Sequence, residues 1–121
     1  MIRILYVDDE ADIREVAQMA LELDPEFEVR ACASGAEGIE AATAWRPDLI
    51  LLDVMMPVMD GPTVLQRLRE APATTAIPVV FITARTQAKE VDALRELGAR
   101  GVLAKPFDPM ALAGQARGFL E

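Results

Sequence analysis

The chain has 121 residues, the length of a single domain. It carries 12 basic and 20 acidic side chains, a formal net charge of −8 at pH 7, and such an acidic balance disfavours binding to duplex nucleic acid. It contains no histidine and one cysteine, Cys32, which excludes imidazole catalysis, imidazole metal sites, internal disulfides and thiolate zinc sites. A bound metal would therefore have oxygen ligands, which favours Mg²⁺, Ca²⁺ or Mn²⁺.

Two features of the sequence bear on its location. The longest strongly apolar stretch, residues 48–53, is far shorter than the ~18 residues that a membrane span needs. The N-terminus reaches Asp8 and Asp9 too early for a secretory signal peptide. We therefore expect one domain over residues 1–121, in the cytoplasm and without membrane contact.

Five apolar runs of strand length alternate along the chain with five segments of helical period. The predicted strands are Ile2–Val7, Glu28–Ala33, Asp48–Leu52, Pro78–Thr83 and Gly101–Ala104. The third of them is apolar on both faces, which indicates a strand buried on both sides of a sheet.

Each of the five segments between and after these strands has a predicted start. The starts are Asp12 with Glu15, Ser34 with Glu37, Pro62 at a first helical position, Thr86, and Asp108 with Pro109. Gly98 is expected in the left-handed position that ends the fourth helix. Strict β–α alternation predicts an α/β fold, a doubly wound (βα)5 flavodoxin-like sandwich with a parallel sheet in the order 2-1-3-4-5.

Charged or hydroxylic side chains follow four of the five strands. Asp8 and Asp9 follow the first strand, Asp53 the third, and Lys105 the fifth, while Thr83 ends the fourth. Ligands of doubly wound sheets bind beyond the carboxyl ends of the strands, so we expect these side chains to share one pocket. Three neighbouring carboxylates repel one another unless a cation joins them, which favours Mg²⁺. A cation, a lysine and a hydroxyl around one carboxylate suit a phosphoryl group.

These residues belong to five motifs that occur in a specific order. The motifs are Val7-Asp8-Asp9-Glu10, Leu51-Leu52-Asp53-Val54-Met55-Met56-Pro57, Met59-Asp60-Gly61, Ile82-Thr83-Ala84 and Lys105-Pro106-Phe107. With them the chain resembles the receiver domain of two-component response regulators, of the free-standing chemotaxis type, over essentially its whole length. The resemblance implies a phosphoacceptor that is switched by phosphorylation and is not an enzyme acting on other substrates.

The resemblance also implies roles for individual residues. Asp53 is then the phosphoacceptor, and Asp9, Asp53 and the backbone carbonyl of Met55 ligate Mg²⁺. Asp8 holds a metal-bound water. The donor is a phosphohistidine of a partner, because this chain has no histidine. That partner is a sensor histidine kinase or a histidine phosphotransfer protein.

Two further residues are expected to meet the phosphoryl group. Lys105 pairs with Asp53 and then with the phosphoryl group, and Thr83 closes onto a phosphoryl oxygen. The Lys105–Pro106 peptide is expected to be cis, as is usual in the family. The chain stops after its last predicted helix, so no output domain and no nucleic-acid contact are expected. Output then depends on a downstream protein that binds around the fourth and fifth helices.

The chain departs from the family pattern at three positions. Val102 stands three residues before the lysine, where an aromatic side chain usually couples the threonine to the output face. Activation is therefore expected to rest on the loop after Thr83 and on the fourth helix. Met55 and Arg85 stand where an amide or carboxylate could orient a hydrolytic water, so we expect spontaneous dephosphorylation not to be fast.

Alternative interpretations stay open. A phosphorylation-independent docking module of the same fold would predict a damaged pocket, but all five pocket residues are present. A Mg²⁺-dependent phosphatase of the aspartyl-phosphate kind would need an aspartate two residues after the nucleophile, where Met55 stands. Asp8 and Asp9 alone could simply favour a helix N-terminus, an interpretation that loses weight beside Asp53, Thr83 and Lys105.

Overall fold

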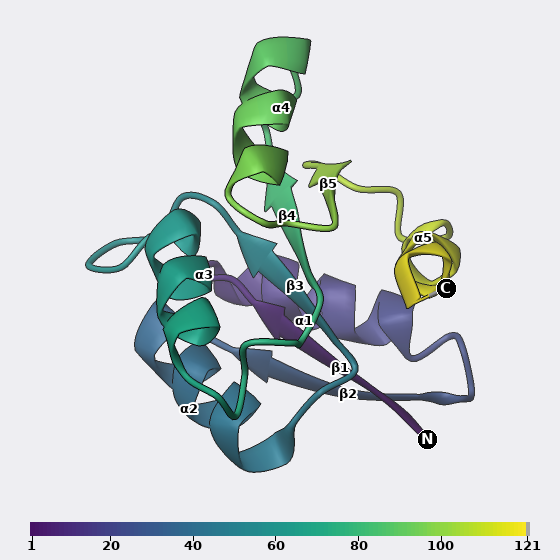
Figure 1. The fold of residues 1–121 in the computed structure, drawn as a ribbon. Helices are drawn as coiled ribbons and strands as arrows, with labels where there is room; N and C mark the ends of the chain where they lie inside the picture. The colour runs from purple at the N-terminus through teal and green to yellow at the C-terminus, as the bar shows by residue number, and fades with distance from the viewer. Residues whose placement is uncertain (121) are drawn as a thin grey trace.

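The computed structural model describes residues 1–120 and shows a five-stranded parallel sheet flanked by helices (Figure 1). The strands are β1 (Ile2–Val7), β2 (Phe27–Cys32), β3 (Leu49–Asp53), β4 (Val79–Thr83) and β5 (Gly101–Ala104). The helices are α1 (Ala11–Leu21), α2 (Gly35–Trp45), α3 (Gly61–Glu70), α4 (Ala88–Glu96) and α5 (Leu112–Leu120). The predicted alternation is confirmed, with boundaries that shift by a few residues.

The sheet has the order β2-β1-β3-β4-β5, as predicted. All four neighbouring pairs are parallel. The chain reverses its direction of travel across the sheet between β1 and β3, so the loops after these two strands diverge. This point is where doubly wound sheets leave a crevice for a ligand.

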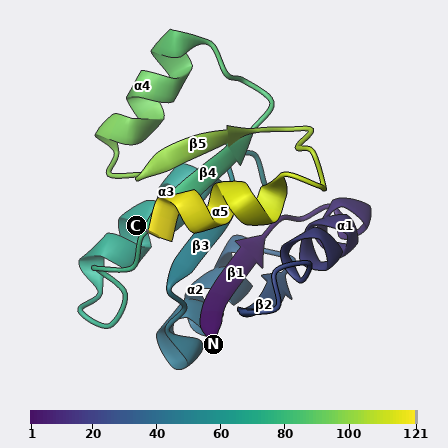
Figure 2. The ribbon, with the colours of Figure 1, turned by 90° about the vertical axis from the view of Figure 1, so that its right-hand side faces the viewer.

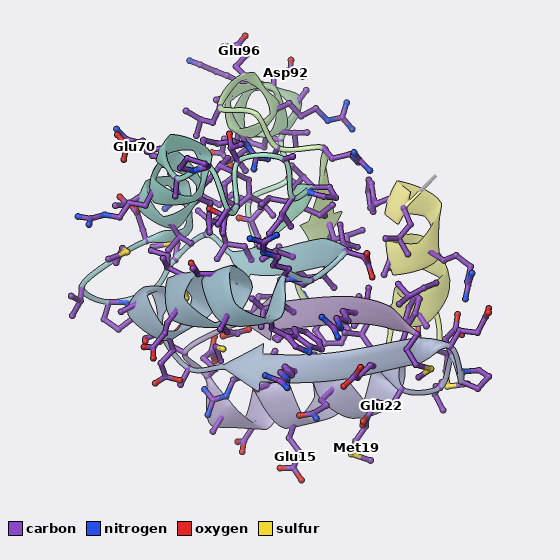
Figure 3. All side chains as sticks on the ribbon, turned by 60° about the horizontal axis from the view of Figure 1, so that its bottom comes forward. Glu15, Met19, Glu22, Glu70, Asp92 and Glu96 are labelled. Atoms are coloured by element: carbon purple, nitrogen blue, oxygen red, sulfur yellow. The ribbon has the colours of Figure 1, made fainter. Side chains whose placement is uncertain are left out.

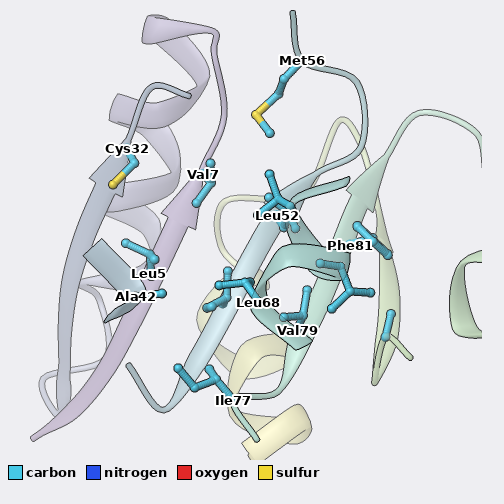
Figure 4. Packing of buried hydrophobic residues seen from close by; sticks show 14 of the residues in the cluster. Leu5, Val7, Cys32, Ala42, Leu52, Met56, Leu68, Ile77, Val79 and Phe81 are labelled. Atoms are coloured by element: carbon cyan, nitrogen blue, oxygen red, sulfur yellow. The ribbon is translucent and has the colours of Figure 1, made fainter. Parts of the chain in front are cut away.

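The helices form one layer on each face of the sheet, which gives two apolar cores. Helices α1 and α5 cover one face and α2 and α3 the other, as the two perpendicular views show (Figures 1 and 2). Figure 4 shows the core beneath α2 and α3, where Leu5, Leu52 and Phe81 of three strands meet Leu68 of α3. Every residue of β3 is buried, which confirms the prediction of a strand covered on both sides.

Trp45 ends α2 at the edge of the sheet opposite the carboxyl ends of the strands. Its ring lies 4.6 Å from the guanidinium carbon of Arg30 and 5.6 Å from that of Arg3, measured to the ring centroid. Its side chain is almost fully buried, and its carbonyl oxygen accepts a hydrogen bond from Arg3 at 2.7 Å. Trp45 therefore closes the core at the end remote from the loops that carry the polar motifs.

One predicted helix start is confirmed, because Ser34 Oγ accepts a hydrogen bond from the Glu37 amide at 3.2 Å. Another is off by one residue, because α3 begins at Gly61 after the N-cap Asp60 and Pro62 is its second residue. Gly98 has a φ of 109° just after α4, as its predicted position requires. The last helix, by contrast, begins at Leu112, three residues later than Pro109, after a turn in which Asp108 accepts a hydrogen bond from the Met110 amide.

Two predicted caps are wrong. Helix α1 begins at Ala11, so Asp12 lies within its first turn and no side chain caps it; the Asp8 carboxylate instead accepts the Glu10 amide at 3.0 Å. Helix α4 has Gln87 as its N-cap, whose backbone carbonyl accepts the amides of Glu90 and Val91. Thr86 therefore does not cap α4.

Helix α4 is the least embedded helix of the described chain. None of its residues is buried, and it packs chiefly beside β5, at the top of Figure 1. Val102 of β5 and Leu94 of α4 are partly buried against the same core. Among residues 1–120, no helix has the length and apolar character that crossing a bilayer would require.

Candidate phosphoryl site

The candidate site lies at the edge of the sheet where β1, β3, β4 and β5 end. The register pairs Val7 with Leu52, Asp53 with Ile82, and Thr83 with Ala104. The residues at and just after these pairs therefore lie at the same height along the strand direction. This register brings Asp8, Asp53, Thr83 and Lys105 to the same edge, as the sequence predicted.

Lys105 joins three carboxylates in this site. Its Nζ lies 3.1 Å from Asp8 Oδ2, 3.2 Å from Asp53 Oδ2 and 3.2 Å from Glu10 Oε1. The Lys105 side chain is 14% exposed, so its contacts with the buried Asp8 and Asp53 are shielded from solvent, whereas the contact with Glu10, whose side chain is 57% exposed, lies at the surface. The Lys105–Pro106 peptide is cis, as expected from the family resemblance.

Asp8 is fully buried, and both of its carboxylate oxygens are occupied by donors from this chain. Oδ1 accepts the Glu10 amide at 3.0 Å, and Oδ2 accepts both the Tyr6 hydroxyl at 2.9 Å and the Lys105 ammonium. Arg14 of α1 donates to the Asp8 carbonyl oxygen at 2.9 Å. A buried carboxylate with several donors meets the condition under which charge is tolerated in a protein interior.

Three of these partners were not singled out from the sequence. Tyr6 precedes Asp8 by two residues, so the alternation of a strand places both side chains on one face, and that spacing was the available signal. Glu10 was noted only as part of a motif. Arg14 carries no local signal, because its contact with Asp8 depends on where α1 lies.

A group of carboxylates in the site could hold a metal ion. One oxygen from each of Asp8, Glu10 and Asp53 lies within 4.8 Å of the others. Asp9, which the resemblance implies as a ligand, is exposed and lies outside this group. Hard carboxylate oxygens are the donors that Mg²⁺ prefers, so the residues present fit that ion.

The electrostatics of the site follow from burial and from these contacts. Burial, together with the charge of Asp8, raises the pKa of Asp53 to about 6, although Lys105 opposes the shift. Burial favours the neutral form of Lys105, but the hydrogen bond to Asp8 and the charge of Asp53 outweigh it and raise its pKa. Burial and the charge of Asp8 also raise the pKa of Tyr6, so its phenol is a hydrogen-bond donor at neutral pH.

An open cavity of about 440 Å³ lies in front of Asp53. Its lining includes Thr83, Lys105, Met55 and Arg85. The buried Thr83 hydroxyl accepts the Arg85 amide at 3.0 Å, which leaves its own proton free to be donated toward the cavity. The cavity therefore offers a carboxylate nucleophile with an ammonium and a hydroxyl beside it.

An apolar groove continues from this cavity along α1. Ile13, Lys105 and Pro106 line both spaces, and the groove then runs past Val16 and Pro109. Beyond them the exposed apolar residues Met19 and Leu23 of α1 extend the same surface. Figure 3 shows Met19 pointing away from the body of the protein, between the acidic side chains Glu15 and Glu22.

The arrangement suits a group that carries negative charge on several oxygens. Lys105 supplies a fixed positive charge, the Thr83 hydroxyl supplies a donor, and the carboxylates of Asp8, Glu10 and Asp53 could hold a divalent cation. Asp53 presents a carboxylate to the cavity that holds these groups. Such a constellation is typical of phosphoryl transfer to a carboxylate.

Comparisons with known proteins agree with this chemistry. The family model described as the response regulator receiver domain matches residues 4–117. The transcriptional regulatory protein CseB of Streptomyces avermitilis is 40% identical over 117 residues, which are 97% of this chain and 48% of that protein. The DNA-binding response regulator MtrA of Mycobacterium tuberculosis is 36% identical over 115 residues, 95% of this chain and 49% of that protein.

Solved structures give the same result for the fold. The chemotaxis response regulator CheY4 of Vibrio cholerae has a TM-score of 0.90 with 32% identity, covering 98% of both chains. A response regulator from Desulfuromonas acetoxidans has a TM-score of 0.87 with 28% identity, covering 99% of this chain and 97% of that chain. The chain spans about half the length of the curated relatives it matches and nearly the full length of these solved chains.

Proposed function

The chain belongs to the response regulator receiver domain family, and from this premise we propose that Asp53 accepts a phosphoryl group from a partner's phosphohistidine. The donor is a sensor histidine kinase or a histidine phosphotransfer protein. The observation that carries the proposal is the placement of Asp53 Oδ2, Lys105 Nζ and the buried Thr83 hydroxyl around one open cavity.

The transfer step follows from these side chains. A carboxylate oxygen of Asp53 attacks phosphorus in line with the donor imidazole, the new O–P bond forms as the N–P bond breaks, and the imidazole leaves with the bonding electrons. The Lys105 ammonium, already 3.2 Å from Asp53, stabilises the charge on the phosphoryl oxygens. The Thr83 hydroxyl then donates to one of those oxygens.

The carboxylates beside Asp53 would hold Mg²⁺. We propose that Asp9, Asp53 and the Met55 carbonyl ligate the ion and that Asp8 holds a metal-bound water, as in the family. Glu10 lies in the same carboxylate group and can add an oxygen. When bound, Mg²⁺ supplies positive charge that offsets the carboxylates and the phosphoryl oxygens.

The role is that of a signalling phosphoacceptor. An aspartyl-phosphate phosphatase would need an acid or base two residues after Asp53, and the residue there is the largely exposed Met55. The chain promotes only its own phosphorylation and dephosphorylation. The placement of Asp53, Thr83 and Lys105 around one cavity favours this role over a phosphorylation-independent docking module.

We propose that phosphorylation alters protein contacts around α4 and α5. Helix α4 has no buried residue, so the loop after Thr83 can reposition it at low energetic cost. Val102 is aliphatic and partly buried, so the coupling passes through this loop and α4. Residues 1–121 act as one receiver unit in the cytoplasm, and their net charge of −8 favours protein over nucleic-acid partners.

The test is phosphorylation by a small donor. The protein is incubated with Mg²⁺ and acetyl phosphate, and its intact mass is measured. We expect a gain of one phosphoryl group in the wild type and in Asp48→Asn, a control at the opposite end of the sheet, but no gain in Asp53→Asn. No gain in the wild type, or a gain that survives in Asp53→Asn, would contradict the proposal.

A further inference from the structure

Tyr6 is a buried polar residue that the phosphotransfer step does not use. It lies in β1 with no exposed surface, and its hydroxyl donates to Asp8 Oδ2 at 2.9 Å. It is also the single tyrosine of the chain. A buried phenol needs a hydrogen-bond partner, and here that partner is a carboxylate, which makes the bond charge-assisted and strong.

The rest of the Tyr6 ring belongs to the apolar core on the side of α1 and α5. The other residues of this cluster include Ala17 of α1, Leu51 of β3 and Leu112 of α5. Packing on all sides removes the rotational freedom of the ring. The hydroxyl therefore approaches Asp8 from a fixed direction.

Tyr6 and Lys105 share one oxygen atom of Asp8. Both donate to Oδ2, while the Glu10 amide occupies Oδ1. Lys105 also contacts Asp53 and Glu10, so its position reflects competition among three carboxylates. Without the phenol, Oδ2 would depend on Lys105 alone, which would draw the ammonium from Asp53 and leave the Asp8 carboxylate less constrained.

We propose that Tyr6 is a positioning residue, whose hydroxyl holds the Asp8 carboxylate in the orientation that the divalent cation requires and keeps Lys105 shared with Asp53. The inference rests on the proposed phosphoacceptor function. Hydrogen-bonding partners of metal-binding side chains fix the orientation of those side chains, and their loss costs about 10–100-fold in metal affinity or activity.

The test uses Tyr6→Phe, which removes the hydroxyl and keeps the ring. Mg²⁺ affinity is measured by calorimetry on the unphosphorylated protein, and the rate of labelling by acetyl phosphate is measured as a function of Mg²⁺ concentration. We expect Mg²⁺ to bind about tenfold more weakly to the variant, with the labelling curve displaced to higher Mg²⁺ concentration by the same factor. Mg²⁺ affinity within twofold of wild type in a folded Tyr6→Phe would overturn the proposal.

Thr74→Val is the matched control for the loss of a buried hydroxyl. Thr74 is also buried, and its hydroxyl donates to the Leu68 carbonyl at 2.7 Å, within the α3–β4 region. This variant should be less stable than wild type with unchanged Mg²⁺ affinity. An equal loss of Mg²⁺ affinity in Thr74→Val would show that lowered stability alone causes the effect, and would overturn the proposal.

A second measurement decides the matter if Tyr6→Phe does not fold. Wild-type protein labelled with fluorotyrosine gives one fluorine resonance, because Tyr6 is the only tyrosine. We expect this resonance to shift on addition of Mg²⁺ with the midpoint found by calorimetry, and an unmoved resonance at saturating Mg²⁺ would overturn the proposal. Failure of wild type to bind Mg²⁺ or to be labelled contradicts the phosphoacceptor function itself, whereas equal Mg²⁺ affinity in wild type and variant contradicts only the role of Tyr6.

Discussion

Lys105 Nζ lies 3.2 Å from Asp53 Oδ2, although 52 residues separate the two in the chain. The contact crosses β4, because β3 carries Asp53 and β5 leads into Lys105. The same ammonium contacts the fully buried Asp8. Lys105 therefore neutralises charge that two strands bring into the interior, so it should stabilise the fold in addition to its proposed role in phosphotransfer.

Replacement of Lys105 by methionine should destabilise the protein at neutral pH. Removal of one member of a buried ion pair leaves uncompensated charge and costs about 3–5 kcal/mol. Because Lys105 is slightly exposed, we expect a loss of about 3 kcal/mol in the free energy of unfolding. Urea unfolding monitored by Trp45 fluorescence measures it. Lys105→Arg keeps the charge and should recover part of the stability. An unfolding free energy of Lys105→Met equal to that of wild type would contradict this account.

The stability of the metal-free protein should fall as pH rises through about 6. The pKa of Asp53 rises from 3.8 to about 6 on folding, so the folded state holds this proton more tightly than the unfolded chain. The resulting stabilisation is complete below pH 4 and is lost as pH rises through 6, with an upper bound of about 3 kcal/mol. Asp53→Asn should lack this pH dependence and be more stable than wild type at pH 7.5.

The measurement for Asp53 is urea unfolding with EDTA at intervals from pH 4 to 8. Asp48→Asn serves as the control that retains the wild-type slope. Parallel curves for wild type and Asp53→Asn across this range would show that Asp53 does not carry the effect.

Val58 should be a position where substitution stabilises the protein. It is fully exposed in the β3–α3 loop and has a φ of 69°, a left-handed conformation that costs a β-branched residue about 1–2 kcal/mol. Asparagine tolerates this conformation, so Val58→Asn should raise the free energy of unfolding by about 1 kcal/mol. Val58→Thr is polar but still β-branched and should bring no gain; an equal gain in both variants would assign the effect to lost apolar exposure.

The phosphorylated protein should lose its phosphoryl group slowly. Met55 and Arg85 both line the cavity in front of Asp53, and neither offers a group that accepts a proton from an attacking water. The double substitution Met55→Asn and Arg85→Glu should accelerate hydrolysis about tenfold, which is a smaller acceleration than a well-placed general base provides. Loss of acid-labile ³²P measures the rates. Decay of the wild type within seconds would contradict the expectation.

Helix α1 should contribute to recognition of the phosphohistidine protein. The groove beside the cavity continues to Met19, which is 65% exposed. For a histidine kinase that phosphorylates the wild type, Met19→Glu should slow phosphotransfer about fivefold, which corresponds to a loss of roughly 1 kcal/mol at an interface. Labelling by acetyl phosphate should be unchanged. Leu97→Glu, at the end of α4, is the exposed apolar control. Equal phosphotransfer to Met19→Glu and wild type would remove α1 from the interface.

The order of elements and the level of the site residues could be predicted from the sequence for a physical reason. Alternating apolar runs specify strands and helices, and parallel strands must end at one edge, so Asp53 and Lys105 meet whatever the details of the loops. The N-terminal caps of the helices were less predictable, because they depend on which side chain accepts a hydrogen bond from a particular backbone amide. The Asp8 carboxylate takes the Glu10 amide and α1 begins before Asp12 can act as a cap.

The adjacent aspartates Asp8 and Asp9 differ in burial, and the sequence did not predict this difference. Asp8 is fully buried while Asp9, one residue further beyond the end of β1, is exposed, and this difference depends on the course of the loop between β1 and α1. The hydrogen bond from Tyr6 to Asp8 depends on whether a phenol hydroxyl reaches a carboxylate two residues further along the chain. The contact of Arg14 with the Asp8 carbonyl depends on the packing of α1, which no local pattern encodes.

Lys105 follows all three of its carboxylate partners in the chain, and this order has a consequence for folding. Asp8, Glu10 and Asp53 leave the ribosome before Lys105 does, so a nascent sheet of β1 to β4 would bring the carboxylates together without the ammonium that joins them. Burial of the Asp8 and Asp53 charges without the ammonium is unfavourable, and this disfavours a four-stranded intermediate. Docking of β5 then removes the repulsion and completes the sheet in the same step, so electrostatics favours the finished domain over its partly folded precursor.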